Sequence, residues 1–518
     1  MTKPLSASLI SGVFLALVFH PWQLDLLVWI ALIPLLWSIH ISENPAKASL
    51  YGWVAGFFFF SLNVRWVYDT LTVHGHFSEY LAATILLVMI ACLALFISFF
   101  SYLCAVAKNS GFSYCLILPT AWVSVEYLRT YALTGFPWDL LGYSLSQSPN
   151  LIQIVDITGV YGLSFLIVFV NSAVLEALIN RSRSFSSVVI QLAVGMALIS
   201  VCALYGWTKI SDYSDRSRTQ TSHTVGILQG GIPQGLKWSE SYRSLTFSKY
   251  EELAMESVAK GAEFLIWPET SVPVVIGGEN LSWMAAMEIS KKVNTPMLIG
   301  APSQTDSSGE ISYFNSAFLV DGSEILSGYD KIHLVPFGEY MPLNWLFPVG
   351  PGMAAREADF SAGTVMTVMK TGNLPAFSVL ICYEAIFPEL SRMAINNGAR
   401  FLVNITNDGW FDTTSAPHQH LFMAKFRSIE NRVWLLRAAN TGISGAFDPT
   451  GLLVDSIDLG ESGWINIQMS APNSVGSFYT KFGDLFAWSC IIVFSLILFR
   501  ALTHQQTSEG MKYEPIRH

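Results

Sequence analysis

Apolar positions dominate the first two hundred residues of the chain and then give way to a mixed pattern. Seven apolar stretches occur before residue 208, and an eighth lies near the carboxyl end. They are 5–19, 26–39, 48–62, 80–107, 112–125, 160–179, 188–207 and 485–499. Several are shorter than the roughly 20 residues that a helix needs to cross a bilayer, but flanking Trp and Tyr side chains can complete the crossing. The pattern predicts a multi-span membrane domain of about eight transmembrane helices.

Short β-rich runs alternate with amphipathic helical stretches between residues 224 and 480. The predicted strands are 224–228, 263–267, 297–300, 317–320, 377–381, 401–405 and 445–448. The predicted helices are 241–260, 281–292, 387–397 and 418–432. This alternation is typical of an α/β domain, and about 250 residues suffice for a hydrophobic core.

These patterns divide the chain into five regions. We expect a transmembrane domain of seven helices at 1–208, a polar linker at 209–223, an α/β domain at 224–480, an eighth transmembrane helix at 483–502 and a tail at 503–518. The chain is 52% hydrophobic and 13% charged, with a net charge of −9. It has no basic stripe, so we expect no nucleic-acid partner.

Positive charges in the short connections predict the orientation of the spans. Most of them fall in alternate connections or beyond the last span: Lys3, Lys47, Lys108, Arg181, Arg183, Arg500 and Lys512. Because Lys and Arg in short loops stay on the cytoplasmic side, both termini should be cytoplasmic. In a bacterium the α/β domain would then be periplasmic, and in a eukaryote it would lie in a lumen or outside the cell.

Only one of the six cysteines, Cys382, lies in the predicted α/β domain. A solitary thiol in an oxidising compartment is either deeply buried or used as a nucleophile. Cys382 directly follows the predicted strand 377–381, and functional sites of α/β sheets lie at the carboxyl ends of their strands. Glu269 follows a second strand, and Lys331 lies in the charged segment 329–339. Thiol, carboxylate and ammonium together could supply a nucleophile, its base and an oxyanion stabiliser.

Three motifs carry these residues and resemble the Glu-Lys-Cys triad of the nitrilase, or carbon-nitrogen hydrolase, superfamily. Glu269 stands in IWPETSVP, Lys331 in YDKIHLVPFGEYMP and Cys382 in ICYE. The eight predicted spans, QGGIPQGLKW at 229–238 and NDGWF at 407–411 are similar to a membrane-bound branch that transfers phospholipid acyl chains to lipoproteins. This resemblance covers nearly the whole chain. It implies an αββα sandwich for the α/β domain and a location in the bacterial inner membrane.

The resemblance also implies a role for each residue. Cys382 would be the acylated nucleophile, Glu269 the general base and Lys331 the oxyanion stabiliser. An unperturbed thiol has a pKa near 8.5 and is mostly protonated at neutral pH, so a carboxylate to take its proton is chemically reasonable.

The motifs also contain residues that would support the triad. The backbone N–H of Tyr383 is a candidate second oxyanion donor. Glu339 and Glu384 match the supporting carboxylates of the superfamily and would orient Lys331 and the loop beside Cys382.

Several aromatic and polar residues are candidates for substrate binding. They are Trp238, Trp345, Phe347, Asn407 and Trp410. Trp345 and Phe347 belong to 343–360, a segment rich in Pro and Gly that could form a hydrophobic lid or could pack as a buried loop. Trp238 could equally be core, and Asn407 with Trp410 could form a structured turn. His418 and His420 have the spacing of a metal pair but lack a third ligand nearby, so we expect neither a metal nor a cofactor.

The expected reaction is a two-step acyl transfer. A phospholipid, for which phosphatidylethanolamine is the expected donor, would acylate Cys382, and the amine of a diacylglyceryl-cysteine in an apolipoprotein would take the acyl group. Two rivals remain: a membrane-tethered amidase that uses the same triad on a soluble carbon-nitrogen substrate, and a transporter with a soluble sensor domain. Eight spans favour transfer between lipids, and few charges at mid-span disfavour transport.

Overall fold

The computed structural model describes residues 2–179, 185–217, 222–307, 310–341, 359–470 and 476–510. The chain divides into two compact units. The helical unit comprises Met1–Tyr68, Glu79–Thr208 and Asp484–His518, and the α/β unit comprises Asp69–Ser78 and Lys209–Gly483. The short segment 69–78 thus belongs to the α/β unit although both of its neighbours in sequence lie in the helical unit.

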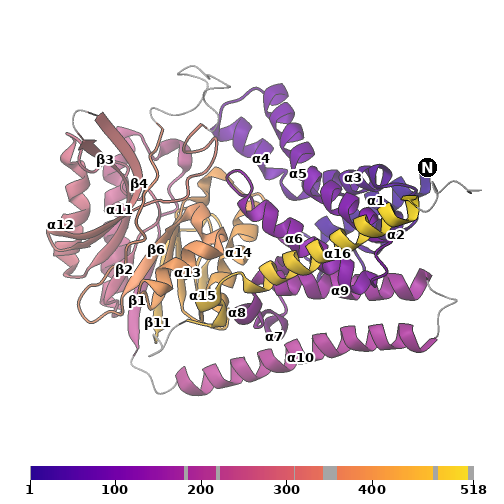
Figure 1. The fold of residues 1–518 in the computed structure, drawn as a ribbon. Helices are drawn as coiled ribbons and strands as arrows, with labels where there is room; N and C mark the ends of the chain where they lie inside the picture. The colour runs from indigo at the N-terminus through magenta and orange to yellow at the C-terminus, as the bar shows by residue number, and fades with distance from the viewer. Residues whose placement is uncertain are drawn as a thin grey trace, which may run out of the picture. The chain divides into compact units, whose positions relative to one another are not determined.

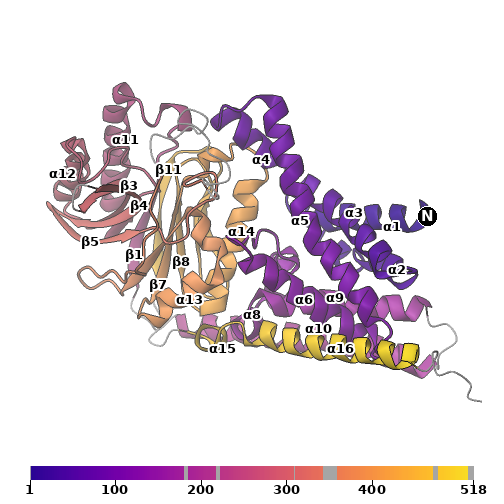
Figure 2. The same cartoon turned by 45° about the horizontal axis from the view of Figure 1, so that its top comes forward.

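Each apolar stretch contains a helix, and Figures 1 and 2 show these helices. The main helices are α1 (Thr2–Leu17), α2 (Ile33–His40), α3 (Pro45–Asn63), α5 (Glu79–Ala107), α6 (Tyr114–Tyr131), α9 (Val160–Ile179), α10 (Phe185–Ser217) and α16 (Leu485–Gly510). Among the described residues, four segments are long and apolar enough to cross a membrane: Glu79–Ala107, Val160–Ile179, Val189–Asp215 and Leu485–His504. The structure therefore supports four of the eight predicted spans and does not establish eight.

Three of the four remaining stretches fall short for identifiable reasons. The first forms a helix of only 16 residues. The second is broken into a 3₁₀ helix, η1 (Asp25–Trp29), and the eight-residue α2. Helix α6 carries Glu126 and Arg129 on buried positions, which lowers its mean hydropathy.

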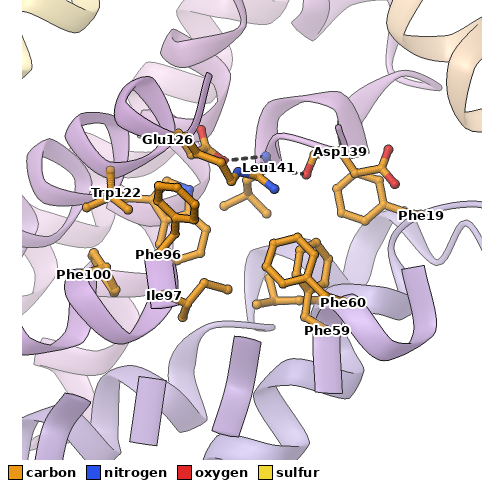
Figure 3. Close-up of a pocket in the computed structure, with 13 residues that line it drawn as sticks. Phe19, Phe59, Phe60, Phe96, Ile97, Phe100, Trp122, Glu126, Asp139 and Leu141 are labelled. Carbon is orange, nitrogen blue, oxygen red and sulfur yellow. Dashed lines mark hydrogen bonds between the residues drawn. The ribbon is translucent and has the colours of Figure 1, made fainter. Parts of the chain in front are cut away.

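Aromatic side chains of the helical unit surround a small cavity of about 30 Å³ beside a buried ionic cluster (Figure 3). Phe59, Phe60, Phe96 and Phe100 are among its walls. The Glu126 carboxylate accepts a hydrogen bond of 2.7 Å from the Leu141 amide. The Asn63 amide donates to Asp139 across 2.8 Å, and the Arg129 guanidinium lies 5.4 Å from the centre of the Phe60 ring. These charges are buried but mostly partnered, as charges in an apolar environment must be.

Helix α10 extends further than its apolar stretch. It continues to Ser217, so residues 209–217, which we expected to form a linker, are helical. Between Gly206 and Ser217 the sequence has neither Pro nor Gly to end the helix. Strand β1 then begins at His223.

The α/β unit contains two sheets packed face to face. The first has the strand order β11 (Gly463–Met469), β1 (His223–Gln229), β2 (Phe264–Ile266), β3 (Met297–Ser307), β4 (Glu310–Asp321) and β5 (Glu324–Asp330). The second has the order β10 (Leu453–Ile457), β9 (Ser444–Phe447), β8 (Leu435–Ala439), β7 (Phe401–Thr406) and β6 (Phe377–Ile381). Phe264 of β2 and Phe377 of β6 meet between the sheets, with ring centroids 5.3 Å apart.

Two pairs of helices cover the outer faces of the sheets. Figures 1 and 2 show α11 (Glu240–Ala259) and α12 (Met284–Val293) on the side opposite α13 (Pro388–Asn396) and α14 (Ala416–Asn431). Apolar residues of α11, α12 and the first sheet form a continuous buried cluster. The αββα sandwich that the resemblance implied is thereby confirmed.

The loops that carry the candidate site residues follow parallel strands. Strands β1, β2 and β3 run parallel in one sheet, and β6, β7 and β8 run parallel in the other. Glu269, Cys382 and Asn407 each follow the carboxyl end of one of these strands. Side chains from both sheets can therefore meet at one edge of the sandwich.

Candidate active site

Cys382 sits at a sharp turn immediately after β6. It opens the short 3₁₀ helix η6 (Cys382–Ile386) and has a φ of 52°, in the left-handed region that non-glycine residues rarely adopt. Such conformations persist only where the surroundings impose them, and they concentrate at functional sites. The turn exposes only 8% of the Cys382 residue surface.

The surroundings of the thiol favour its protonated form. Burial and the Glu269 carboxylate raise the pKa of Cys382 well above its ordinary value, while Lys331 acts in the opposite direction. The resting residue is therefore a thiol, and a base must remove its proton before it can act as a nucleophile.

Glu269 reaches the site on a tight loop that follows β2. The next residue, Thr270, has a φ of 49°, and a Cβ atom on Gly300 would lie 2.5 Å from the Pro268 carbonyl oxygen, so only glycine fits beneath the loop. Oε2 of Glu269 accepts a hydrogen bond of 2.7 Å from the main-chain N–H of Asn407. The carboxylate is thus held in one orientation.

Lys331 lies just after β5 and is 1% exposed. Its Nζ atom is 2.9 Å from the Glu339 carboxylate and 4.0 Å from Oε1 of Glu269. Burial opposes the charge, but Glu339, Cys382 and Glu269 together raise the pKa of Lys331 above its usual value. Lys331 is therefore a permanent cation that is paired mainly with Glu339.

Asn315 of β4 links the two carboxylates and was not anticipated from the sequence. Its Nδ2 atom donates to Oε1 of Glu269 and to Oε1 of Glu339, each across 2.7 Å. An asparagine in a strand carries no motif, so only the register of β4 against its neighbours reveals this role.

Lys237 is a second buried lysine that sequence reasoning missed, although its neighbour Trp238 was singled out. It is 1% exposed, and its Nζ atom donates to the main-chain oxygen of Glu269 across 3.0 Å. Burial lowers the pKa of Lys237 to about 7, against smaller opposing effects of Glu269 and Cys382. The only signal in the sequence was its place in QGGIPQGLKW.

Glu384 ties the Cys382 turn to the loop that carries Lys331. One carboxylate oxygen accepts from the Ile381 amide across 2.7 Å. The other accepts from the Ile332 amide at 2.7 Å and from the Tyr329 hydroxyl at 2.8 Å. Burial raises the pKa of Glu384 to about 7. The two carboxylates expected to support the site therefore contact different parts of it: Glu339 holds the Lys331 side chain, and Glu384 holds its loop.

The candidates for substrate binding fall into two groups. Asn407 is buried, and its side chain bonds Gln234 at 2.7 Å and Asn440 at 3.2 Å, which makes it part of the scaffold beside Glu269. Trp238 and Trp410 are 53% and 39% exposed, so both indoles are accessible. Trp345 and Phe347 lie outside the described residues.

A segment from far upstream packs beside Trp410. The hydroxyl of Thr70 donates to the Trp410 carbonyl oxygen across 3.0 Å. The His74 ring meets the Trp410 ring edge to face at 5.6 Å, and its Nε2 atom is 3.1 Å from the Asp412 carboxylate. Residues 69–78 are thus a structural part of the α/β unit next to NDGWF.

Comparison with known proteins gives matches over both units. Residues 11–173 match the family described as apolipoprotein N-acyltransferase N-terminal domain, and residues 224–472 match the carbon-nitrogen hydrolase family. The apolipoprotein N-acyltransferase of Geobacter metallireducens is 35% identical over 511 residues, which cover 96% of each chain. That of Brucella melitensis is 31% identical over 485 residues, 90% of each chain. An amidase structure from Nesterenkonia sp. has 19% identity and a TM-score of 0.36, and the match covers 49% of this chain and 92% of that one.

Proposed function

Because the chain belongs to the apolipoprotein N-acyltransferase family, we propose that it moves an acyl chain from a phospholipid to a lipoprotein amine through a thioester on Cys382. Glu269 is the base and Lys331 the oxyanion stabiliser of this ping-pong reaction. Phosphatidylethanolamine is the proposed donor, and diacylglyceryl-cysteine at the amino terminus of an apolipoprotein is the acceptor.

In the first half-reaction Glu269 takes the thiol proton of Cys382 while the sulfur attacks the ester carbonyl carbon. The negative charge that develops on the carbonyl oxygen is stabilised by the ammonium of Lys331 and the N–H of Tyr383. The carbon–oxygen bond of the ester then breaks, and the departing lysophospholipid oxygen takes the proton from Glu269. The products are a thioester and a lysophospholipid.

In the second half-reaction the neutral acceptor amine attacks the thioester carbon. Glu269 takes one proton from the amine, the carbon–sulfur bond breaks and the Cys382 thiolate takes that proton back. The thiol is regenerated and the product carries an amide. Exclusion of water between the two steps is needed, because water would hydrolyse the thioester.

The division of charge around Cys382 is the observation that carries this proposal. Lys331 pairs at 2.9 Å with Glu339 and lies 4.0 Å from Glu269. Glu339 therefore neutralises the cation, which leaves Glu269 as the carboxylate that can accept a proton from the thiol. The high pKa of the buried thiol is the reason that such a base is required.

We also propose that the helical unit lies in the bacterial inner membrane with the α/β unit in the periplasm. Helices α10 and α16 expose large apolar side chains such as Met196, Leu204, Leu496 and Phe499, each more than 60% accessible. Apolar surface on this scale is unfavourable in water and suits a lipid environment. The distribution of Lys and Arg in the connections supports the orientation.

Hydrolysis of a soluble amide by the same triad is the alternative. It is the weaker candidate because relatives of 30% identity or more across nearly the whole chain are named as N-acyltransferases.

The test is intact-mass analysis of the purified full-length protein with vesicles that contain phosphatidylethanolamine. We expect an acyl adduct on Cys382, release of lysophospholipid, and loss of the adduct when a diacylglyceryl-cysteine peptide is added, with N-acylated peptide as product. Cys382→Ala is the control without the nucleophile. Hydrolysis of short amides without any adduct from phospholipid would instead establish the amidase.

A further inference from the structure

The imidazole of His420, on α14, contacts the main chain of Cys382. Its Nε2 atom lies 3.1 Å from the carbonyl oxygen of Cys382, and Nδ2 of Asn404 lies 3.5 Å from the same oxygen. A carbonyl oxygen can only accept hydrogen bonds, so Nε2 of His420 carries the hydrogen and donates it. The exposed fractions of His420 and Asn404 are 1% and 0%. The main chain of the strained residue is therefore held from the interior of the domain.

A closed ionic network fixes the imidazole. Nδ1 of His420 lies 3.1 Å from Oδ1 of Asp408 and 3.2 Å from Nη2 of Arg437. Asp408 and Arg437 form an ion pair of 2.6 Å, and the Thr406 hydroxyl donates to Asp408 across 2.9 Å. All of these groups are buried. The network pairs its own charges and leaves Nε2 of His420 directed at Cys382.

The donated hydrogen does not depend on the charge of the imidazole. Burial and Arg437 lower the pKa of His420, against an opposing effect of Asp408. In the neutral ring Nδ1 accepts from Arg437. Protonation would place a second hydrogen on Nδ1, where the Asp408 carboxylate accepts it. Nε2 keeps its hydrogen in both states, so the contact with Cys382 is insensitive to pH.

The geometry of a peptide group connects this contact to the reaction. The carbonyl of Cys382 and the N–H of Tyr383 belong to one planar trans peptide unit, so they point in opposite directions. A side chain that fixes the carbonyl on one side also fixes the direction of the N–H on the other. That N–H is the second oxyanion donor of the proposed mechanism.

We propose that His420 is a positioning residue that aims the Tyr383 N–H at the developing oxyanion by holding the Cys382 carbonyl. The inference rests on the proposed acyl transfer and adds a residue to its machinery. It predicts that the loss of the Nε2 donor weakens attack on a carbonyl but not reactions of the thiol that form no oxyanion.

The experiment compares two reactions of Cys382 in the full-length protein. Acylation by p-nitrophenyl butyrate and by phosphatidylethanolamine vesicles passes through an oxyanion, whereas alkylation by iodoacetamide does not. His420→Leu should slow acylation by at least about tenfold, a part of the 100- to 1,000-fold effect of losing an oxyanion donor, and leave alkylation within about twofold. His420→Gln, whose amide can place an N–H near Nε2, should recover most of the acylation rate. His418→Leu, on the same helix, is the matched control and should match the native protein.

The possible results separate the two proposals. Equal loss of both reactions in His420→Leu, unchanged acylation, or a Gln variant no better than Leu would each overturn the positioning role. Acylation of the native protein by the nitrophenyl ester but not by phospholipid would refute the proposed donor and leave the His420 comparison valid. Absence of any adduct from either ester in the native protein would overturn both.

Discussion

The Nζ atom of Lys237 donates a hydrogen bond of 3.0 Å to the main-chain oxygen of Glu269. The proposed base is thus held by its backbone as well as by its carboxylate. The contact also places a second buried amine in the candidate site, and burial lowers the pKa of Lys237 to about 7. Near neutral pH this amine can exist in either charge state.

The low pKa of Lys237 predicts how stability depends on pH. Between pH 7 and 10 the folded protein leaves this amine neutral, whereas the unfolded chain protonates it, so the free energy of unfolding rises with pH. When the pH is raised from 7 to 9, the melting temperature of the native protein should therefore increase relative to that of Lys237→Met. Thermal unfolding of both proteins in one detergent measures this, with the exposed Lys260→Met as control. Parallel pH profiles for native and Lys237→Met would show that the lysine is charged throughout.

Glu339→Gln should impair the first half-reaction severely. The substitution removes the charge that pairs with Lys331 at 2.9 Å, and the ammonium would turn to Glu269, now only 4.0 Å away. The base and the oxyanion stabiliser would then neutralise each other. We expect acyl-enzyme formation to fall by roughly a hundredfold or more, measured by intact mass in a single turnover. Glu324→Gln, an exposed change in the same sheet, should have no effect, and normal acylation in Glu339→Gln would exclude this role.

Asn315→Asp should slow acylation more than Asn315→Ala does. A third carboxylate would face Glu269 and Glu339 at the 2.7 Å contacts that the amide now makes. An ionised aspartate cannot donate these two hydrogen bonds, and its negative charge would also draw the Lys331 ammonium away from the developing oxyanion. We expect acyl-enzyme formation to fall by roughly a hundredfold in Asn315→Asp and by less in Asn315→Ala, measured by intact mass in a single turnover. Equal rates in the two variants would show that the added charge does not act on the reaction.

Thiol labelling tests the proposed orientation. In a chain whose native cysteines are replaced by serine, Ser222→Cys should react with a membrane-impermeant reagent in intact spheroplasts. Ser508→Cys should react only after lysis. The reverse pattern would place the α/β unit in the cytoplasm.

Much of the α/β fold could be predicted from the local periodicity of apolar residues. The seven predicted strands and four predicted helices are all present, because each has an apolar face of the right period. The missed strands β5, β8, β10 and β11 lack that signal. Strand β8 contains the buried Arg437, and β5 and β10 are edge strands whose side chains are largely exposed. Strand β11 pairs with β1, which is distant in sequence.

Motifs that carry chemistry singled out part of the candidate site, and the contacts made by tertiary packing could not be predicted. Glu269, Lys331 and Cys382 were expected to act together, and the structure brings Lys331 within 4.0 Å of Glu269, with both residues acting electrostatically on the Cys382 thiol. Asn315 and Lys237 escaped notice because an amide in a strand and a lysine in a loop are ordinary surface residues until burial is known. His420 was considered only for metal binding, and its contact with Cys382 depends on how α14 packs against η6.

Residues 69–78 have a consequence for biosynthesis. They are translated before the rest of the α/β unit, and all of Glu79–Thr208 is made in between. The contacts of Thr70 and His74 with Trp410 and Asp412 can therefore form only late, when most of the chain has emerged. A fragment that contains only residues 209–483 would therefore lack the partners that Trp410 and Asp412 have in the whole chain.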